Sequence, residues 1–269
     1  SLLPPLSNEE QIAVTKLHSL AGEAIDDVLT SRPFRSPHHT ASRIALIGGG
    51  AKPKPGEISL AHLGVLFLDE IPEYPRTTLE ALRQPLEDNC VSISRAGGHV
   101  TYPANFMLVA TMNPCPCGFY GDEKRECTCS QQQILGYQQR LSGPLLDRID
   151  LVVNVGRVTN EELLNHASMN NSQHNEATEA IQHAYTLQSN RYKSSVLHNS
   201  NLSSRDVKSK LALSPAVRQL LTKATEKLNV SARSYFKIIK VARTIADLEN
   251  ATEIEPQHIA EAIQYRIQK

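Results

Sequence analysis

The sequence has no excess of charge of either sign and no long apolar run, and each absence excludes a class of protein. The 28 lysines and arginines equal the 28 aspartates and glutamates in number. Contact with nucleic acid would therefore need a local basic patch, or a ring of subunits that repeats a small one. No apolar stretch approaches the roughly 20 residues of a membrane-spanning helix, and the first residues lack the basic and apolar regions of a secretion signal. We expect a cytoplasmic protein with no membrane partner.

Cysteine is scarce, and its distribution is uneven. Four of the five cysteines fall in two C-x-C pairs, and the fifth, Cys90, stands apart. The pairs are Cys115 with Cys117 and Cys127 with Cys129. In a chain without a secretion signal, clustered cysteines indicate a metal site more often than disulfides. Four thiolates can hold one tetrahedral Zn²⁺, so we predict a structural zinc site; the alternative is four reduced surface thiols.

The first part of the chain, residues 1–156, alternates helical and apolar-strand patterns, as α/β domains do. Three apolar runs, residues 65–68, 106–111 and 151–155, predict strands buried in a parallel sheet. Between the first two, the alternating residues 91–102 around Gly97-Gly98 predict a β-hairpin.

The second part, residues 157–269, shows no strand pattern and predicts a smaller all-helical domain. Ser231 is a good N-cap for one of its helices. The apolar face of that helix includes Ile238 and Ala242, and its other face is predicted to carry Lys237, Lys240 and Arg243.

Two adjacent carboxylates, Asp69 and Glu70, follow the first apolar run. The carboxyl ends of parallel strands form the ligand-binding edge of a sheet. In a nucleotide hydrolase, the first carboxylate at this place positions Mg²⁺ and the second polarises the attacking water. The alternative is a solvated acidic turn.

The phosphate loop that accompanies such a strand, G-x-x-x-x-G-K-[ST], is absent from this sequence. Gly48-Gly49-Gly50 is rich in glycine, but Pro53 and not Ser or Thr follows Lys52, so we interpret this stretch as a flexible loop. The chain thus carries half of a nucleotide site. Either its amino end is missing, or it is a degenerate ATPase.

Three further polar residues stand next to predicted strands or helix ends. Asn113 follows the second strand, where it can bind a phosphate or orient a water; the alternative is a turn before Pro114. Arg148 precedes the third strand, where it can reach across a subunit interface or pair with Asp147 or Asp150. Arg233, in the first turn after Ser231, can reach a γ-phosphate or remain solvated.

Taken together, these signals resemble the AAA+ ATPases, and within them the magnesium-chelatase-like branch. The resemblance covers most of the chain and is specific as a set. It rests on residues 32–39, 55–62, 64–70, 110–118, 142–150 and 231–248.

The resemblance implies an αβα AAA+ core over residues 1–156 and a helical lid over residues 157–269. It implies a bacterial, hexameric ATPase that moves along single-stranded or branched DNA and promotes branch migration in natural transformation and recombination, with ATP and Mg²⁺ as cofactors. By the same resemblance, Asp69 and Glu70 form Walker B, Asn113 is sensor 1, Arg148 the arginine finger and Arg233 sensor 2.

The sequence departs from that family at its start. The family has an amino-terminal domain and then the Walker A loop before the segment that opens here. Without that loop, no backbone amides or lysine hold the β- and γ-phosphates. We therefore expect this chain by itself to bind nucleotide weakly at best and not to hydrolyse it.

The predicted hairpin offers Arg95 and His99 near its tip, where a ring of subunits could present them to DNA phosphates; the alternative is a solvated turn. Two other functions stay open. The chain could be a non-catalytic pseudo-ATPase or assembly module, or a magnesium-chelatase subunit, against which the cysteine cluster argues.

Overall fold

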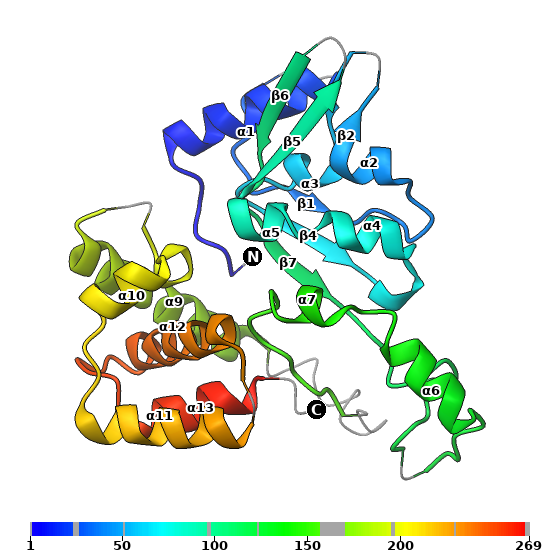
Figure 1. Cartoon of the computed structure of the whole chain (residues 1–269). Coiled ribbons are helices and arrows are strands. Elements are labelled where there is room, and N and C mark those ends of the chain that lie inside the picture. Colours follow the sequence, from blue (N-terminus) through cyan, green and yellow to red (C-terminus); the bar gives the residue numbers. More distant parts are fainter. Residues whose placement is uncertain are drawn as a thin grey trace. The chain divides into compact units, whose positions relative to one another are not determined.

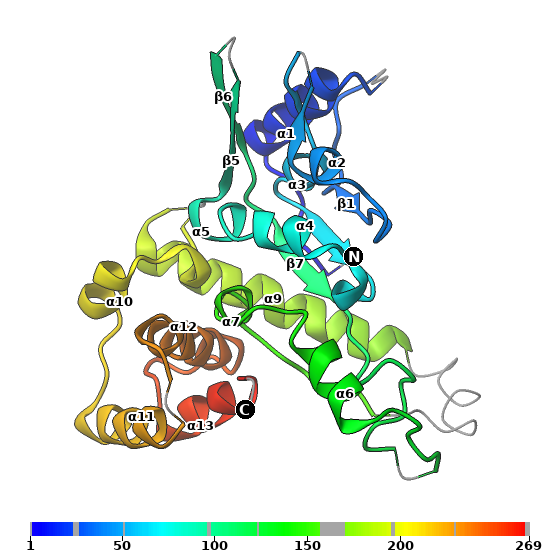
Figure 2. The same cartoon turned by 45° about the vertical axis from the view of Figure 1, so that its right-hand side comes forward.

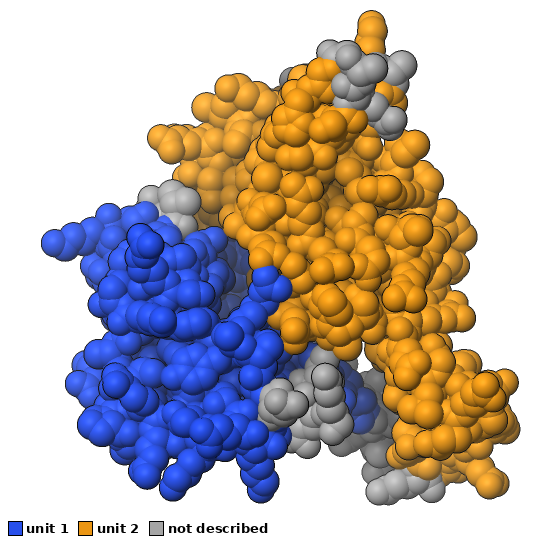
Figure 3. All heavy atoms as spheres, in the orientation of Figure 1, with its two compact units in different colours: residues 1–4, 149–269 blue, residues 5–148 orange. Residues whose placement is uncertain are grey.

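The computed structural model describes residues 2–23, 27–50, 52–95, 98–122, 124–156, 170–194, 197–228 and 230–266 (Figure 1). The chain forms two compact units, one of residues Pro5–Arg148 and one of Ser1–Pro4 with Ile149–Lys269 (Figure 3). We call them the α/β unit and the helical unit. The units change at residue 148, whereas the predicted domain boundary at residue 156 stays a prediction.

A parallel sheet of three strands organises the α/β unit. Its order is β1 (Phe34–Arg35), β4 (Val65–Leu68) and β7 (Met107–Ala110). The middle strand pairs on both sides, and its Leu66 and Leu68 are fully buried. Two of the predicted strands are thereby confirmed. Gly64 lets β4 start beside β1, because a Cβ there would lie 2.0 Å from the carbonyl oxygen of Pro33.

Five helices pack around this sheet, and four of them contribute fully buried or nearly fully buried side chains to its core. They are α1 (Asn8–Ala21), α2 (Arg43–Ile47), α3 (Glu57–Leu60), α4 (Arg76–Ala81) and α5 (Pro85–Asp88). Their buried members Leu17, Leu46, Ile58 and Leu79 join one cluster with the strand residues. Pro85 stands at the start of α5, where its missing N–H does no harm.

The predicted hairpin is confirmed as β5 (Cys90–Arg95) and β6 (Gly98–Pro103), which project from the sheet as a two-stranded arm (Figures 1 and 2). Val91 pairs with Tyr102 and Ile93 with Val100. These residues are buried or half-buried at the base of the arm, which fixes its register.

The glycine-rich stretch is ordered rather than a free loop. β2 (Gly48–Gly49) pairs antiparallel with β3 (Lys54–Pro55), so the interpretation as a flexible loop is wrong for Gly48 and Gly49. Glycine is needed for this pairing. Gly48 has φ +98°, and a Cβ there would lie 2.2 Å from the carbonyl oxygen of Lys54.

The third predicted strand does not form. Residues 151–156 have no strand partner, and Val155 is 86% exposed. The backbone around them bonds to the end of the helical unit instead. Val152 N–H donates to the carbonyl of Tyr265 at 2.8 Å, and Arg266 Nη1 donates to the carbonyl of Ile149 at 2.7 Å. An apolar run forms a strand only where a neighbouring strand has free backbone groups with which it can hydrogen-bond.

The described residues of the helical unit contain helices and no strands, as predicted. The helices are α9 (Asn170–Tyr192), η2 (Asn199–Asn201), α10 (Ser204–Lys210), α11 (Pro215–Lys227), α12 (Ala232–Leu248) and α13 (Pro256–Gln264). The core residues Ile238 and Ala242 of α12 pack with Leu221 of α11 and Ile259 of α13.

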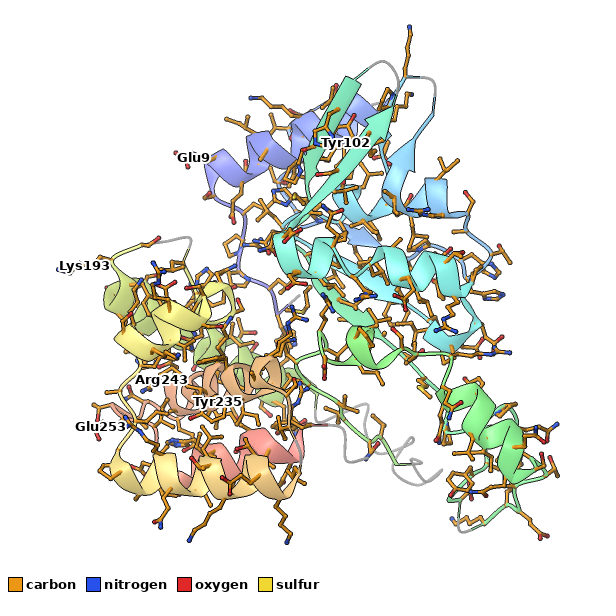
Figure 4. The ribbon with its side chains drawn as sticks, in the orientation of Figure 1. Glu9, Tyr102, Lys193, Tyr235, Arg243 and Glu253 are labelled. Atoms are coloured by element: carbon orange, nitrogen blue, oxygen red, sulfur yellow. The ribbon has the colours of Figure 1, made fainter. Side chains whose placement is uncertain are left out.

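Arg243 of α12 is buried, so its predicted place on an exposed basic face is wrong (Figure 4). Its Nε donates to Asp247 at 3.0 Å, and its two Nη atoms donate to the carbonyls of Ala251 and Thr252. Arg191 of α9 also binds the fully buried Asp247. The carboxylate one turn later explains why this arginine faces inward.

Serine opens helices in both units. In seven of them the Ser side chain at the N-cap accepts a hydrogen bond from a backbone N–H of the first turn. The residues are Ser7, Ser42, Ser130, Ser142, Ser203, Ser214 and Ser231. Within the described part of the chain, no helix has both the length and the apolar character to cross a bilayer.

Candidate nucleotide site and cysteine cluster

Asp69 and Glu70 lie directly after β4, at the carboxyl edge of the sheet, and both are exposed. Glu70 adopts left-handed backbone angles, with φ 48° and ψ 53°, and so turns the chain sharply into η1 (Ile71–Glu73). A non-glycine residue in this region is uncommon and is held there by its surroundings. The two carboxylates are thus fixed at the sheet edge where the sequence predicts them.

Thr111 is the residue that holds this turn. Its hydroxyl donates to Asp69 Oδ1 at 2.5 Å and accepts the backbone N–H of Glu70 at 2.9 Å. The backbone adds two bonds, from Thr111 N–H to the carbonyl of Leu68 and from Ile71 N–H to the carbonyl of Thr111. The sequence analysis did not predict this role for Thr111. It could have been inferred from the position of a hydroxyl residue at the end of β7, the strand that pairs with β4.

Asn113 follows Thr111 by two residues and is exposed at the same sheet edge. Tyr137 of α6 (Gln131–Gln138) is buried near it. Burial raises the pKa of Tyr137, the carboxylates of Glu73 and Glu70 raise it further, and the backbone of Asn113 lowers it. Tyr137 therefore lies close to the predicted site although it belongs to a distant part of the sequence, and no local pattern predicts this.

Arg148 ends the α/β unit just after α7 (Gly143–Leu146). Its Nε donates to the carbonyl of Arg83 at 3.1 Å, its Nη1 donates to the carbonyl of Pro144 at 2.7 Å, and its Nη2 pairs with Glu87. Glu87 is a partner that the sequence reading did not name. Arg148 is thus fastened to the helices of its own unit.

Arg233 is exposed in the first turn of α12, in the helical unit. Its charge and that of Arg266 act on Lys237. Burial lowers the pKa of Lys237, the carboxylate of Asp150 opposes this shift, and the charges of Arg266 and Arg233 add to it. The structure therefore brings Asp69, Glu70 and Asn113 together at one sheet edge. Arg148 lies by α7 in that same unit, and Arg233 belongs to the other one.

The four clustered cysteines converge on one point between β7 and α6. Their Sγ atoms all lie within 4.8 Å of one another. Cys115 Sγ is 3.4 Å from Cys117 Sγ and 3.7 Å from Cys127 Sγ, and Cys117 Sγ is 3.6 Å from Cys127 Sγ. Zn²⁺ with four bonds of about 2.3 Å needs sulfurs roughly 3.8 Å apart. The donor set therefore fits one tetrahedral zinc ion.

Backbone amides support these sulfurs as they support thiolates. Tyr120 N–H donates to Cys115 Sγ at 3.3 Å. Hydrogen bonds from the backbone of Phe119 and, to a lesser degree, of Thr128 lower the pKa of Cys117 to about 5. For Cys127 a backbone hydrogen bond from Cys129 acts in the same direction, but burial and the neighbouring thiols raise the pKa of both Cys127 and Cys129. Cys117 is therefore the thiol of the group that most easily becomes the thiolate a metal binds.

The predicted DNA-contact residues lie on the β5–β6 arm. His99 is exposed, with Nδ1 2.9 Å from the Ser94 hydroxyl and Nε2 3.3 Å from that of Thr101. The backbone of Arg95 pairs with Gly98, but its side chain lies outside the described residues. The role of both residues stays a prediction.

An α/β core with paired carboxylates at the sheet edge, followed by a helical domain, is the AAA+ architecture, and this predicted fold class is confirmed. Residues 1–163 match the family described as magnesium chelatase, subunit ChlI. Residues 171–266 match its C-terminal counterpart. The chain belongs to this magnesium-chelatase-like AAA+ family, as the resemblance implied.

Individual relatives refine this placement. The uncharacterized protein YifB of Salmonella typhimurium is 43% identical over 98% of this chain and 51% of its own length. The competence protein ComM of Haemophilus influenzae is also 43% identical, over the same shares. The chloroplastic magnesium-chelatase subunit ChlI of Nicotiana tabacum is 23% identical over 81% of this chain and 45% of its own length. The chain thus resembles ComM and YifB more than the chelatase subunit, and it spans about half the length of the curated relatives it matches.

Proposed function

We propose that this chain forms the catalytic and lid part of an ATP hydrolase that moves along DNA. The observation that carries the proposal is the group at the end of β4 and β7. There Thr111 holds Asp69 and the turn of Glu70, and Asn113 lies exposed beside them. A core does not need two exposed carboxylates at the ligand-binding edge of a sheet, but a metal-assisted hydrolase does.

Each residue of this group has a chemical role in the proposal. Asp69 would hold Mg²⁺, which would supply positive charge to stabilise the phosphate oxygens. Glu70 accepts a hydrogen bond from the attacking water and orients it toward the γ-phosphorus. Asn113 donates its amide N–H to a γ-phosphate oxygen or to the same water. These 269 residues hold no phosphate loop, so in the proposal another segment supplies it.

The two arginines complete the site from other subunits or domains. In the proposal, six copies form a ring, and Arg148 leaves Glu87 to reach the nucleotide of the neighbouring subunit. There it stabilises the charge of the transition state. Arg233, in the first turn of α12, serves as a second sensor of the γ-phosphate. The β5–β6 arm, with Arg95 and His99, faces the DNA.

The cellular role in this proposal is branch migration during the uptake and recombination of DNA. Its support is the name of the Haemophilus relative, a competence protein. We further propose that Cys115, Cys117, Cys127 and Cys129 bind one structural Zn²⁺. A chelatase function is less well supported, because the chelatase relative is only 23% identical.

The test uses a longer protein in which a phosphate loop precedes this chain. The variant Glu70→Gln keeps the shape of the side chain but cannot polarise water as well. It should bind ATP as the wild type does and hydrolyse it at least about 10²-fold more slowly. The control is Glu9→Gln, an exposed carboxylate at the start of α1 (Figure 4), which should leave turnover unchanged. Wild-type protein that binds ATP without hydrolysing it would instead indicate a pseudo-ATPase.

A mixing experiment tests the action of Arg148 between subunits. Arg148→Ala should lower turnover by about 10³-fold or more, the usual effect of losing an arginine finger. Mixed with Glu70→Gln subunits, it should regain activity, because some interfaces then combine an intact Glu70 with an intact Arg148. Unchanged turnover in Arg148→Ala, or no recovery in the mixture, would exclude the role in trans.

A further inference from the structure

The cysteine cluster lies next to Asn113 in the chain and is tied to it a second time through α6. We propose that the metal-loaded cluster is an anchor that positions Asn113, so that metal occupancy controls the geometry of the nucleotide site. The inference rests on the proposed function for the roles of Asn113 and of the zinc ligands. It adds a regulatory link between the two sites.

The first tie is the chain itself. Pro114 is the single residue between Asn113 and Cys115, and Cys115 is fully buried. At the other end of the loop, Cys129 directly precedes Ser130, the N-cap of α6. A metal bound by both cysteine pairs would therefore hold the segment after β7 and the start of α6 close together.

The second tie runs back from α6 to the sheet edge. Gln138 Nε2 donates to the carbonyl of Pro114, the residue after Asn113, at 3.1 Å. Arg140 Nη1 donates to the carbonyl of Pro72 at 3.1 Å and to Glu73 at 2.9 Å. These contacts join the end of α6 to the residue beside Asn113 and to the turn that follows Glu70.

This second tie depends on the metal because the loop has little else to hold it. Among the described residues 114–122 and 124–130, Cys115 is the only buried one. A segment without an apolar core gains its order from metal binding, as in small zinc domains. Without the ion, four thiols in van der Waals contact have no bond to keep them together. The start of α6 then loosens, and with it the hydrogen bond from Gln138 to the carbonyl of Pro114, next to Asn113.

Hydrogen exchange of the 269-residue chain, measured with zinc bound and after chelation, tests the link without any need for catalysis. Removing zinc should speed exchange at the Asn113 amide and in α6 by about fivefold or more, the effect of losing roughly one hydrogen bond. Exchange in the β5–β6 arm and in the helical unit should stay the same. Cys127→Ser should reproduce the zinc-free pattern, and Cys90→Ser, outside the cluster, should not.

A second variant removes the contact between α6 and the segment beside Asn113 while leaving the metal site intact. Gln138→Leu should keep one zinc per chain and still speed exchange at Asn113, because only the hydrogen bond to the Pro114 carbonyl is lost. Zinc that binds and leaves without any change at Asn113 would overturn the link while leaving the zinc site intact. A chain that binds no zinc and shows four freely reacting thiols would overturn both. Neither outcome bears on Glu70, whose role the hydrolysis experiment tests separately.

Discussion

Two uncharged side chains, Thr111 and Tyr137, arrange the acidic edge of the sheet. Thr111 bonds to the Asp69 carboxylate and to the Glu70 amide, and Tyr137 is buried near the backbone of Asn113. Both act on residues far away in sequence. The Thr111 hydroxyl carries no charge at any physiological pH, so its two hydrogen bonds need no titration to form.

His62 is the side chain through which pH acts most directly on the α/β unit. It is half-buried, and its Nδ1 accepts the backbone N–H of Asn105 at 3.1 Å, which requires a neutral ring at that nitrogen. Burial lowers the pKa of His62 to about 4, with Glu10 opposing the shift weakly. The unfolded chain, with an ordinary histidine near 6.5, takes up this proton at a higher pH than the folded chain.

The free energy of unfolding should therefore fall as the pH drops below about 6.5, and this contribution should be complete above that value. The pKa difference sets a ceiling of about 3 kcal/mol, and solvent at the half-buried ring brings the expected loss nearer to 2 kcal/mol. His62→Gln should remove this loss between pH 7 and pH 4.5, as measured by urea denaturation. His183→Gln, an exposed histidine of α9, should keep the wild-type pH profile. A parallel profile for His62→Gln would contradict the assignment.

At the scale of elements, α12 organises the helical unit through a buried ionic group. Asp247 is fully buried, and it binds Arg191 from α9, Arg243 one turn earlier, and Asn199 from η2. Three elements thus meet at one carboxylate. A buried charge is tolerated here because every partner is a donor.

Asp247→Ala should destabilise the chain strongly, because it leaves the buried Arg243 without its carboxylate. Loss of one partner of a buried pair costs about 3–5 kcal/mol. Urea denaturation of the helical transition would measure this, with Glu226→Ala on the exposed face of α11 as control, expected within about 0.5 kcal/mol of wild type. A loss below about 1 kcal/mol would mean that water reaches the group.

The elements that sequence patterns predicted are those whose pattern is local. β4 and β7 carry continuous apolar runs, and the β5–β6 hairpin alternates around two glycines. Residues 151–155 are also an apolar run, but a strand needs a partner as well, and a local pattern cannot supply one. β1 was missed because two residues carry no period.

In the candidate site, too, the residues that a local pattern marks were predicted and those placed by the fold were not. Asp69, Glu70 and Asn113 were predicted because strand ends mark the sheet edge. The four cysteines were predicted from their spacing. Tyr137 was not, because it reaches Asn113 only through the fold of the intervening loop. Arg243 was misplaced because arginine on a helix is usually exposed, and its partner Asp247 decides otherwise.

For the whole molecule, the absence of net charge means that the proposed DNA contact needs either a local basic patch or the repetition of a small one in a ring. A ring of subunits would present several copies of the β5–β6 arm, and each phosphate neutralised would release counterions. A single Arg95 per chain would then suffice to give affinity that falls steeply with salt.

In the longer, assembled protein, Arg95→Ala should weaken DNA binding across sequences and flatten its dependence on salt. ATP hydrolysis without DNA should persist, and strand movement should be uncoupled from it. Binding measured by fluorescence anisotropy at several salt concentrations would show this. Lys52→Ala, in the β2–β3 turn, is the matched comparison. An effect of Lys52→Ala with none from Arg95→Ala would move the DNA contact to that turn.

The serine N-caps have a consequence for how the chain tolerates mutation. Removing the hydroxyl of one N-cap serine, as in Ser→Ala, typically costs about 1 kcal/mol. Four of the seven caps lie in the α/β unit and three in the helical unit, so losing all of them would cost about 4 and about 3 kcal/mol respectively, a large share of the net stability of a typical domain. A single such change is tolerated at a measurable cost. A lineage that accumulates several of them drifts toward unfolding without altering any core residue.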